Sequence, residues 1–106
     1  MVILSHIVKL FYFGIFDFHI YLCNQMDKSI HTRQYRQLIG LVREEREKRQ
    51  MTQGQLAYML GVQQAVVSKI ENCERRIDLL ELRQICQALG VSLIEIINKF
   101  EERISQ

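Results

Sequence analysis

The segment 63–72, QQAVVSKIEN, places polar side chains at the spacing of one helix face. Val67 and Ile70 are three residues apart, so a helix would turn both toward the protein interior. The opposite face then carries Gln64, Ala65, Ser68, Lys69 and Asn72. A glutamine can form two hydrogen bonds with an adenine edge, a lysine can donate to guanine, and an alanine can pack on a thymine methyl. Such a face suits the major groove of duplex DNA.

The same side chains are also ordinary on a solvated helix, so the context has to decide between the two interpretations. The stretch from Thr52 to Asn72 predicts a short helix, a turn centred on Gly61 and a second short helix. A glycine at the turn and an apolar anchor at Val62 let two helices meet at a steep angle. This spacing is typical of a helix-turn-helix, and within it we expect Gln64 to contact DNA.

Helix boundaries are marked by a repeated local signal, a capping side chain followed three positions later by an acid or amide that can bond back to the chain. The three pairs are Thr52 with Gln55, Asp78 with Glu81, and Ser92 with Glu95. Gly61 and Gly90 follow apolar runs and suit the left-handed residue that ends a helix. A further apolar stripe predicts a helix to about Arg49, and its members are Tyr35, Leu38, Ile39 and Val42.

These signals predict a compact, all-α domain of five helices. The chain contains no proline, the residue that most strongly interrupts a helix. One core is expected, and its inward residues are Leu56, Ala57, Leu60, Val62, Val67, Ile70, Leu79, Leu82, Ile85, Cys86, Leu89, Leu93, Ile96, Ile97 and Phe100. Cys86 is interpreted as a small buried hydrophobe rather than a reactive thiol. The run 43–49, REEREKR, alternates in sign and is interpreted mostly as exposed helix.

Length and composition limit the other possibilities. The 106 residues allow one domain, which we place at 32–106, and the net charge of +2 is too small to identify a partner by itself. The three cysteines are widely spaced, and neither a disulfide framework, a metal site nor a cofactor is indicated. A reducing cytoplasm fits this cysteine usage. No catalytic triad, carboxylate pair or phosphate-binding glycine loop is evident, so we do not expect an enzyme.

The N-terminal extension, 1–31, differs from the rest of the chain because its first 25 residues are largely apolar. Lys9 and Asp17 interrupt the run, and a charge near the middle of a bilayer costs roughly 2.5 to 3.5 kcal/mol, so a membrane span is not favoured. No signal-peptide cleavage site follows. The alternatives are a dimerisation arm, a poor membrane anchor, or upstream sequence translated before a true start at Met26.

Three stretches, MTQGQLAYMLGV, VVSKIEN and LRQICQALGVSLIEII, stand in the order and spacing of one known family. From about Tyr35 to Phe100 the chain resembles the lambda-repressor-like family of Cro, phage-repressor and xenobiotic-response-element type regulators. The resemblance implies base reading by Gln63, Gln64, Ala65, Ser68 and Lys69. It implies phosphate contacts by Gln53, Arg43, Asn72, Arg75 and Arg76. It also implies a structural ion pair between Arg46 and Glu71. Loss of one partner would leave the charge of the other without compensation.

The sequence departs from the family pattern at three positions. Cys73 replaces the glycine that commonly follows the recognition helix, and Asn72 is expected to take the left-handed conformation instead. Gly54 lies inside a helix and costs up to about 1 kcal/mol relative to alanine. Gln63 stands where a better helix cap is usual. Arg75 and Arg76 suit surface ion pairs as well as phosphate contacts.

The function that the sequence predicts is sequence-specific binding of duplex DNA by a transcriptional regulator, a repressor, acting as a homodimer on two half-sites about one helical turn apart. Ile94 and Ile104 are spare apolar residues for dimerisation, and RNA polymerase is a candidate partner. One rival is an antitoxin that also binds a toxin. Others are a protein-interaction adaptor that has lost DNA binding, which would show no salt-dependent affinity for DNA, and a membrane-tethered regulator.

Overall fold

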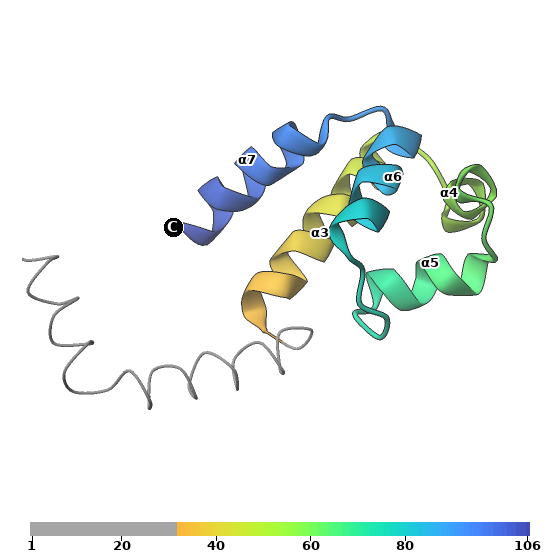
Figure 1. Ribbon diagram of the computed structural model, residues 1–106, viewed down its shortest axis with the longest axis horizontal. Helices are drawn as coiled ribbons and strands as arrows, with labels where there is room; N and C mark the ends of the chain where they lie inside the picture. The colour runs from red at the N-terminus through yellow and green to blue at the C-terminus, as the bar shows by residue number, and fades with distance from the viewer. Residues whose placement is uncertain (1–31) are drawn as a thin grey trace, which may run out of the picture.

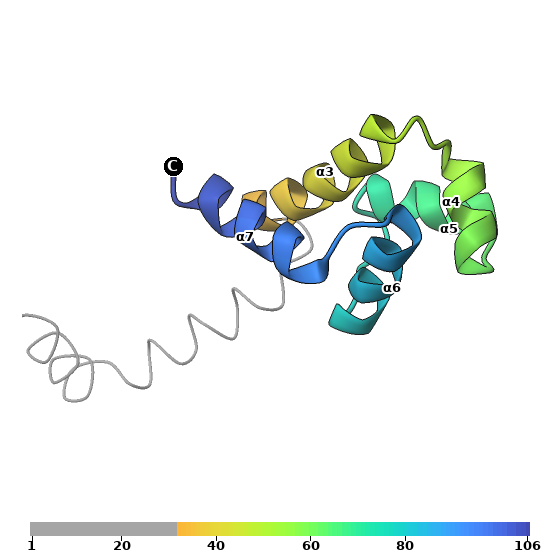
Figure 2. The same ribbon diagram turned by 90° about the horizontal axis from the view of Figure 1, so that it is seen from above.

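The computed structural model describes residues 32–106, so the interpretations of the extension and of a start at Met26 lie outside the described residues. The described part folds into five α-helices and contains no strand, as predicted. Helices α4 and α5 lie at one end of the domain, and α7 runs beside α3 (Figures 1 and 2). The helices are α3 (Arg33–Lys48), α4 (Gln53–Leu60), α5 (Gln64–Glu71), α6 (Leu79–Leu89) and α7 (Leu93–Ile104).

Two of the three predicted capping boxes are present. At the start of α4 the Gln55 N–H donates to Thr52 Oγ1 over 3.0 Å, and the Thr52 N–H donates to Gln55 Oε1 over 2.8 Å. At the start of α6 the Glu81 N–H donates to Asp78 Oδ1 over 2.7 Å, and the reciprocal bond is 3.3 Å long. Each box satisfies backbone donors that a helix leaves unpaired in its first turn.

The third predicted box, at the start of α7, is wrong. Ser92 is the N-cap residue of α7, but its side chain makes no capping hydrogen bond. The Glu95 carboxylate instead lies 3.5 Å from the ammonium of Lys99, one turn further along the helix.

Gly61 and Gly90 end α4 and α6 in the left-handed conformation, with φ of 71° and 75°, as predicted. The expectation that Asn72 would take this conformation after α5 is wrong, because Asn72 has φ −85° and Cys73 has φ 58°. The N–H of Glu74 then donates back to the Lys69 carbonyl over 2.8 Å. The chain reverses at the position after the helical cap, so position rather than residue type selects the left-handed residue.

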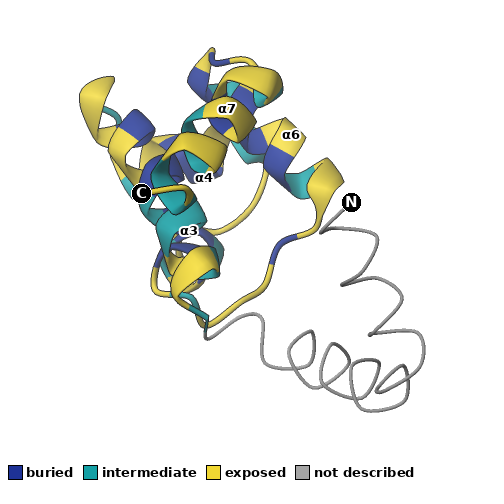
Figure 3. Ribbon diagram, turned by 90° about the vertical axis from the view of Figure 1, so that its left-hand side faces the viewer, coloured by how far each residue is buried: buried dark blue, intermediate teal, exposed yellow. Residues whose placement is uncertain are grey.

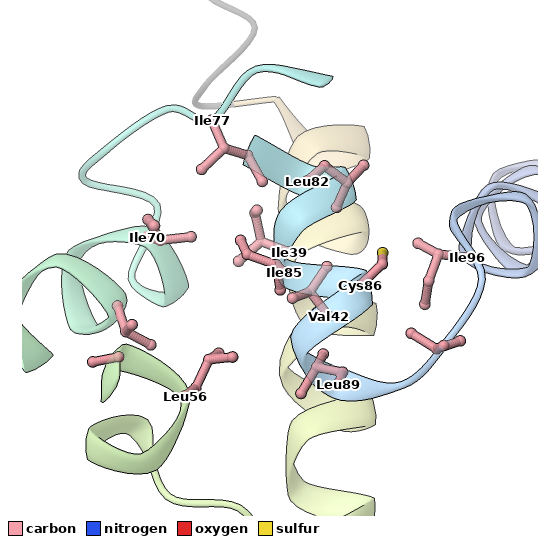
Figure 4. Close-up of a cluster of buried hydrophobic side chains, with 13 residues drawn as sticks. Ile39, Val42, Leu56, Ile70, Ile77, Leu82, Ile85, Cys86, Leu89 and Ile96 are labelled. Carbon is pink, nitrogen blue, oxygen red and sulfur yellow. The ribbon is translucent and has the colours of Figure 1, made fainter. Parts of the chain in front are cut away.

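The core lies between α3, the α4–α5 pair and α6, and Ile96 of α7 closes it from the far side (Figure 4). Most of the predicted core is confirmed, including Cys86, which is 1% exposed. Val62, Leu79 and Ile97 were expected inside but are 40%, 62% and 38% exposed. Val62 and Leu79 stand at the end of a turn and in a first helical turn, where the helix face does not yet meet a neighbour.

Helix α3 also buries a second side, against α7, which the stripe of apolar residues did not predict. Leu41 is 2% exposed and Glu45 is 3% exposed, so the interpretation of 43–49 as mostly exposed helix is wrong at Glu45. The Glu45 carboxylate accepts hydrogen bonds from Lys99 over 2.8 Å and from Arg49 over 2.6 Å. Figure 3 shows the buried residues on the inner sides of α3, α6 and α7. No helix within 32–106 is both long enough and apolar enough to cross a membrane.

Candidate nucleic-acid interface

The α4–turn–α5 unit fixes which side of α5 is turned outward. Gly61 reverses the chain after α4, and the Val62 N–H donates to the Ala57 carbonyl over 3.0 Å, which keeps the turn tight. Val67 and Ile70 are buried on the inner side of α5. The opposite side of this eight-residue helix therefore faces solvent.

The base-reading candidates lie on or beside that outer side. Gln63, Gln64, Ala65 and Lys69 are exposed, and Ser68 is half-buried. Gln63 is the N-cap residue, and its side chain makes no capping bond, consistent with its being a poor cap. Within the described residues the side chains of Gln64 and Lys69 have no hydrogen-bond or ion-pair partner. Their polar atoms are therefore free for a partner outside the chain.

Glu71, at the end of α5, is bonded to both α3 and the start of α4. Its carboxylate accepts from Arg46 Nε over 2.6 Å and from the second Arg46 terminal nitrogen, Nη2, over 3.0 Å, which is the ion pair that the resemblance implied. Gln53 Nε2 donates to the same carboxylate over 2.8 Å. Both charged residues are buried, and the hydrogen bonds with Glu71 raise the pKa of the Arg46 guanidinium. These bonds hold the orientation of α5 in the domain.

The candidate phosphate-binding residues differ in whether an ion pair neutralises their charge. Arg43 is half-exposed and lies 3.0 Å from the Glu47 carboxylate, whereas Arg75 lies 2.7 Å from the Glu81 carboxylate. Arg76 is exposed and makes no ion pair in the described part of the chain. Gln53 braces α5 through its hydrogen bond to Glu71, while its contact with phosphate stays a prediction. Asn72 is exposed at the end of α5.

Charge neutralisation divides the surface into two sides. On the α3–α7 side, cations pair with carboxylates, as Lys99 does with Glu45 and Arg103 does with Glu44 over 2.9 Å. Within 32–106 the basic residues without an ion pair are Arg33, Arg36, Lys69, Arg76 and Arg83. Lys69 and Arg76 belong to α5 and the loop that follows it. Unneutralised positive charge therefore occurs beside the outer side of α5, where a polyanion would be attracted.

Two residues on the first turns of α3 had no predicted role at the interface, although Tyr35 was expected in the apolar stripe of this helix. Tyr35 Oη accepts a hydrogen bond from the Ile77 N–H over 3.1 Å, which holds the loop 72–78 against α3, and burial raises the pKa of this phenol. Arg36 is exposed beside this loop. It stands two helical turns before Arg43, and this seven-residue spacing was the signal that could have identified it.

Comparisons with known proteins agree with this geometry. A family model described as helix-turn-helix matches residues 42–96. The fold is similar to that of an XRE-family like protein from Pseudomonas syringae pv. tomato, with a TM-score of 0.67 and 37% identity over 74% of this chain and 96% of that one.

A restriction-modification controller protein, C.Esp1396I, has the same fold. It was solved as a tetramer in complex with its natural 35 base-pair operator, and it is similar to this chain with a TM-score of 0.65 and 23% identity. The match covers 71% of this chain and 99% of that one. No curated protein sequence matches the chain.

Proposed function

Because this chain belongs to the helix-turn-helix family of Cro/C1-type transcription regulators, we propose that it represses transcription by binding a specific duplex DNA sequence. The observation that carries the proposal is the outer side of α5. It is held by the buried Arg46–Glu71 pair, and it presents unpartnered polar side chains to solvent. An α-helix of this kind fits the major groove, where each base pair presents a distinct pattern of donors and acceptors.

Base reading is assigned to the exposed start and middle of α5. Gln64 has both an amide donor and a carbonyl acceptor and can pair with an adenine edge, while Lys69 can donate to guanine. Gln63, Ala65 and Ser68 lie beside them and complete the reading face. Ala65 offers a methyl group for contact with thymine.

Phosphate contacts are assigned to the residues around α5. Arg76 carries free charge, and Asn72 offers an exposed amide at the end of the helix. Arg43 and Arg75 would have to exchange their carboxylate partners for phosphate, which costs little because these ion pairs are largely solvent-exposed. Gln53 is assigned two roles: it holds α5 through its hydrogen bond to Glu71, and it contacts a phosphate.

A homodimer on two half-sites about one helical turn apart is part of the proposal. Ile94 on α7 is 70% exposed and offers apolar surface for subunit contact, whereas Ile104 is half-buried. The controller protein with the same fold, solved as a tetramer on its operator, supports an arrangement with several subunits. Occupation of a promoter by such an assembly would exclude RNA polymerase, and the proposed activity takes place in the cytoplasm.

The experiment that tests the reading face compares Lys69→Ala with Arg83→Ala, an equal change of charge on α6. Lys69→Ala should weaken binding to the preferred duplex by roughly 1 to 3 kcal/mol and relax selectivity at one base pair. Competition against single-base variants of that duplex measures both effects. An unchanged base preference in Lys69→Ala would contradict the assignment. An equal loss of binding in Arg83→Ala would show that Lys69 contributes only non-specific attraction between positive charge and DNA.

A further inference from the structure

A hollow of about 780 Å³ lies between α3 and the residues at the end of α5, and its lining includes Arg36 and Gly40, to which no role has been assigned above. Its α3 wall includes Arg36, Gly40 and Arg43, and its opposite wall is formed by residues 71–74. Figure 1 shows the first turns of α3 and the α5–α6 loop at the same edge of the domain as α5. The hollow therefore opens beside the surface assigned to DNA.

The positive charge of the hollow comes from α3. Arg36 and Arg43 stand two turns apart on one side of the helix, and both line the hollow. Arg36 makes no ion pair within 32–106, and its charge lowers the pKa of the Cys73 thiol across the hollow, although burial raises that pKa overall. Arg43 is paired with the exposed Glu47, so the free charge of Arg36 is what favours an anionic occupant of the hollow.

The negative groups of the opposite wall compete only in part. Glu71 is buried and its carboxylate is already bonded to Arg46 and Gln53. Glu74 is exposed and makes no ion pair among the described residues. Glu74 is therefore the one acid of this wall that is free to repel an anion.

Gly40 supplies a second, independent observation. A glycine inside a helix is destabilising relative to alanine, and a Cβ added at Gly40 would meet nothing within 4 Å. Packing within the domain thus gives no reason for a glycine here. The open space above it lies between the two arginines, where an outside group can approach the helix backbone closely.

We propose that this hollow holds a backbone phosphate of the bound duplex, with Arg36 as its principal contact and Gly40 leaving room for the approach. The inference rests on the proposed function and extends it, because it carries the phosphate contact on α3 from Arg43 back to the first turn of that helix. Hydrogen bonds between guanidinium and phosphate are charge-assisted, and each neutralised phosphate adds to the salt dependence of binding.

The test uses the full chain and the duplex that the wild-type protein enriches from a randomised pool. Arg36→Ala should weaken binding roughly tenfold and reduce the slope of log K against log salt by about one. Gly40→Gln fills the hollow with a side chain that favours helix, so it should weaken binding roughly tenfold without lowering the melting temperature. Glu74→Gln should tighten binding by up to about fivefold, a gain that misfolding cannot produce.

Arg83→Ala, on α6, is the matched control for loss of one positive charge. If Arg36→Ala, Gly40→Gln or Glu74→Gln binds like Arg83→Ala, the phosphate site is overturned, while the proposed function stands. If the wild-type chain retains no duplex at any salt concentration, the proposed function itself fails. Ethylation of single phosphates provides a direct map, because Arg36→Ala should abolish interference at one phosphate and leave the others unchanged.

Discussion

At the scale of single residues, a buried charge pair holds the end of α5 against α3. Arg46 and Glu71 are 7% and 8% exposed, and the carboxylate is satisfied from two helices. Taking two charges out of water is costly, so such a pair adds little net stability. Its value is geometric, because each partner can adopt only the position that satisfies the other.

Arg46→Ala leaves the Glu71 carboxylate buried without its ionic partner, and it should lower the free energy of unfolding by about 3 to 5 kcal/mol. Urea denaturation followed by circular dichroism measures this change. Arg43→Ala, on the exposed side of the same helix, should change stability by less than about 1 kcal/mol. If both variants lose the same amount, the buried pair has no special structural role.

Glu45 gives the domain a specific response to acid. Hydrogen bonds from Lys99, and then from Arg49, hold the pKa of this carboxyl well below its ordinary value of 4.5, at about 2. Because the pKa is lowered in the folded state, its stabilising contribution is complete above pH 4.5 and is lost as the pH falls toward 2. The contribution has an upper bound of about 3 kcal/mol, which solvent around the partner cations reduces.

Glu45→Gln should therefore be less stable than the wild type at pH 7, and the difference should shrink as the pH falls from 4.5 toward 2. Unfolding free energies at a series of pH values measure it. Glu101→Gln, on an exposed position of α7, should follow the wild-type profile. A difference between Glu45→Gln and wild type that stays constant across this range would show that the ion pairs of Glu45 do not stabilise the fold.

At the scale of the element, the turn between α4 and α5 depends on one backbone conformation. Gly61 has φ 71°, and a Cβ there would meet no other atom within 4 Å, so the cost of a side chain is conformational. Gly61→Ala should lower stability by about 1 to 2 kcal/mol. Gly54→Ala, inside α4, should instead raise stability by about 0.5 to 1 kcal/mol. Thermal melting measures both, and shifts of the same sign would contradict this account of the turn.

The sequence predicts those elements whose signals are local. Thr52 and Asp78 form the predicted boxes because their partners lie three residues away. Glu81 takes part with one carboxylate oxygen while the other pairs with Arg75. At Ser92 the same spacing forms no box, and Glu95 lies beside Lys99 instead. Glu45 could not be recognised as buried from its neighbours, because α7 brings Lys99 to it from 54 residues away.

At the candidate site, too, the features set by local spacing are predictable and those set by long-range contacts are not. The outer side of α5 follows from the three-residue spacing of Val67 and Ile70, which is visible in the sequence. The hollow at Arg36 depends on how the loop after α5 folds back on α3, and a hydrogen bond between Tyr35 and Ile77 determines that placement. Such long-range contacts leave no periodic pattern from which to predict them.

At the scale of the whole molecule, the described domain has two electrostatic sides. Carboxylates neutralise the cations between α3 and α7, whereas free cations remain around α5, on the first turns of α3 and at Arg83 of α6. A net charge of only +2 is thus compatible with attraction to DNA, because the distribution of charge sets the local field. Binding should weaken steeply as salt rises, with a slope of log K against log salt of about −0.9 for each phosphate contacted.

The central claim is that this chain recognises a specific duplex sequence, and selection from a randomised duplex pool by the full chain at two salt concentrations tests it most directly. We expect an enriched motif with two-fold symmetry, half-sites about one helical turn apart, and lower affinity at the higher salt concentration. Recovery of no motif, with no retention of DNA even at low salt, would contradict the claim and favour a protein-interaction adaptor.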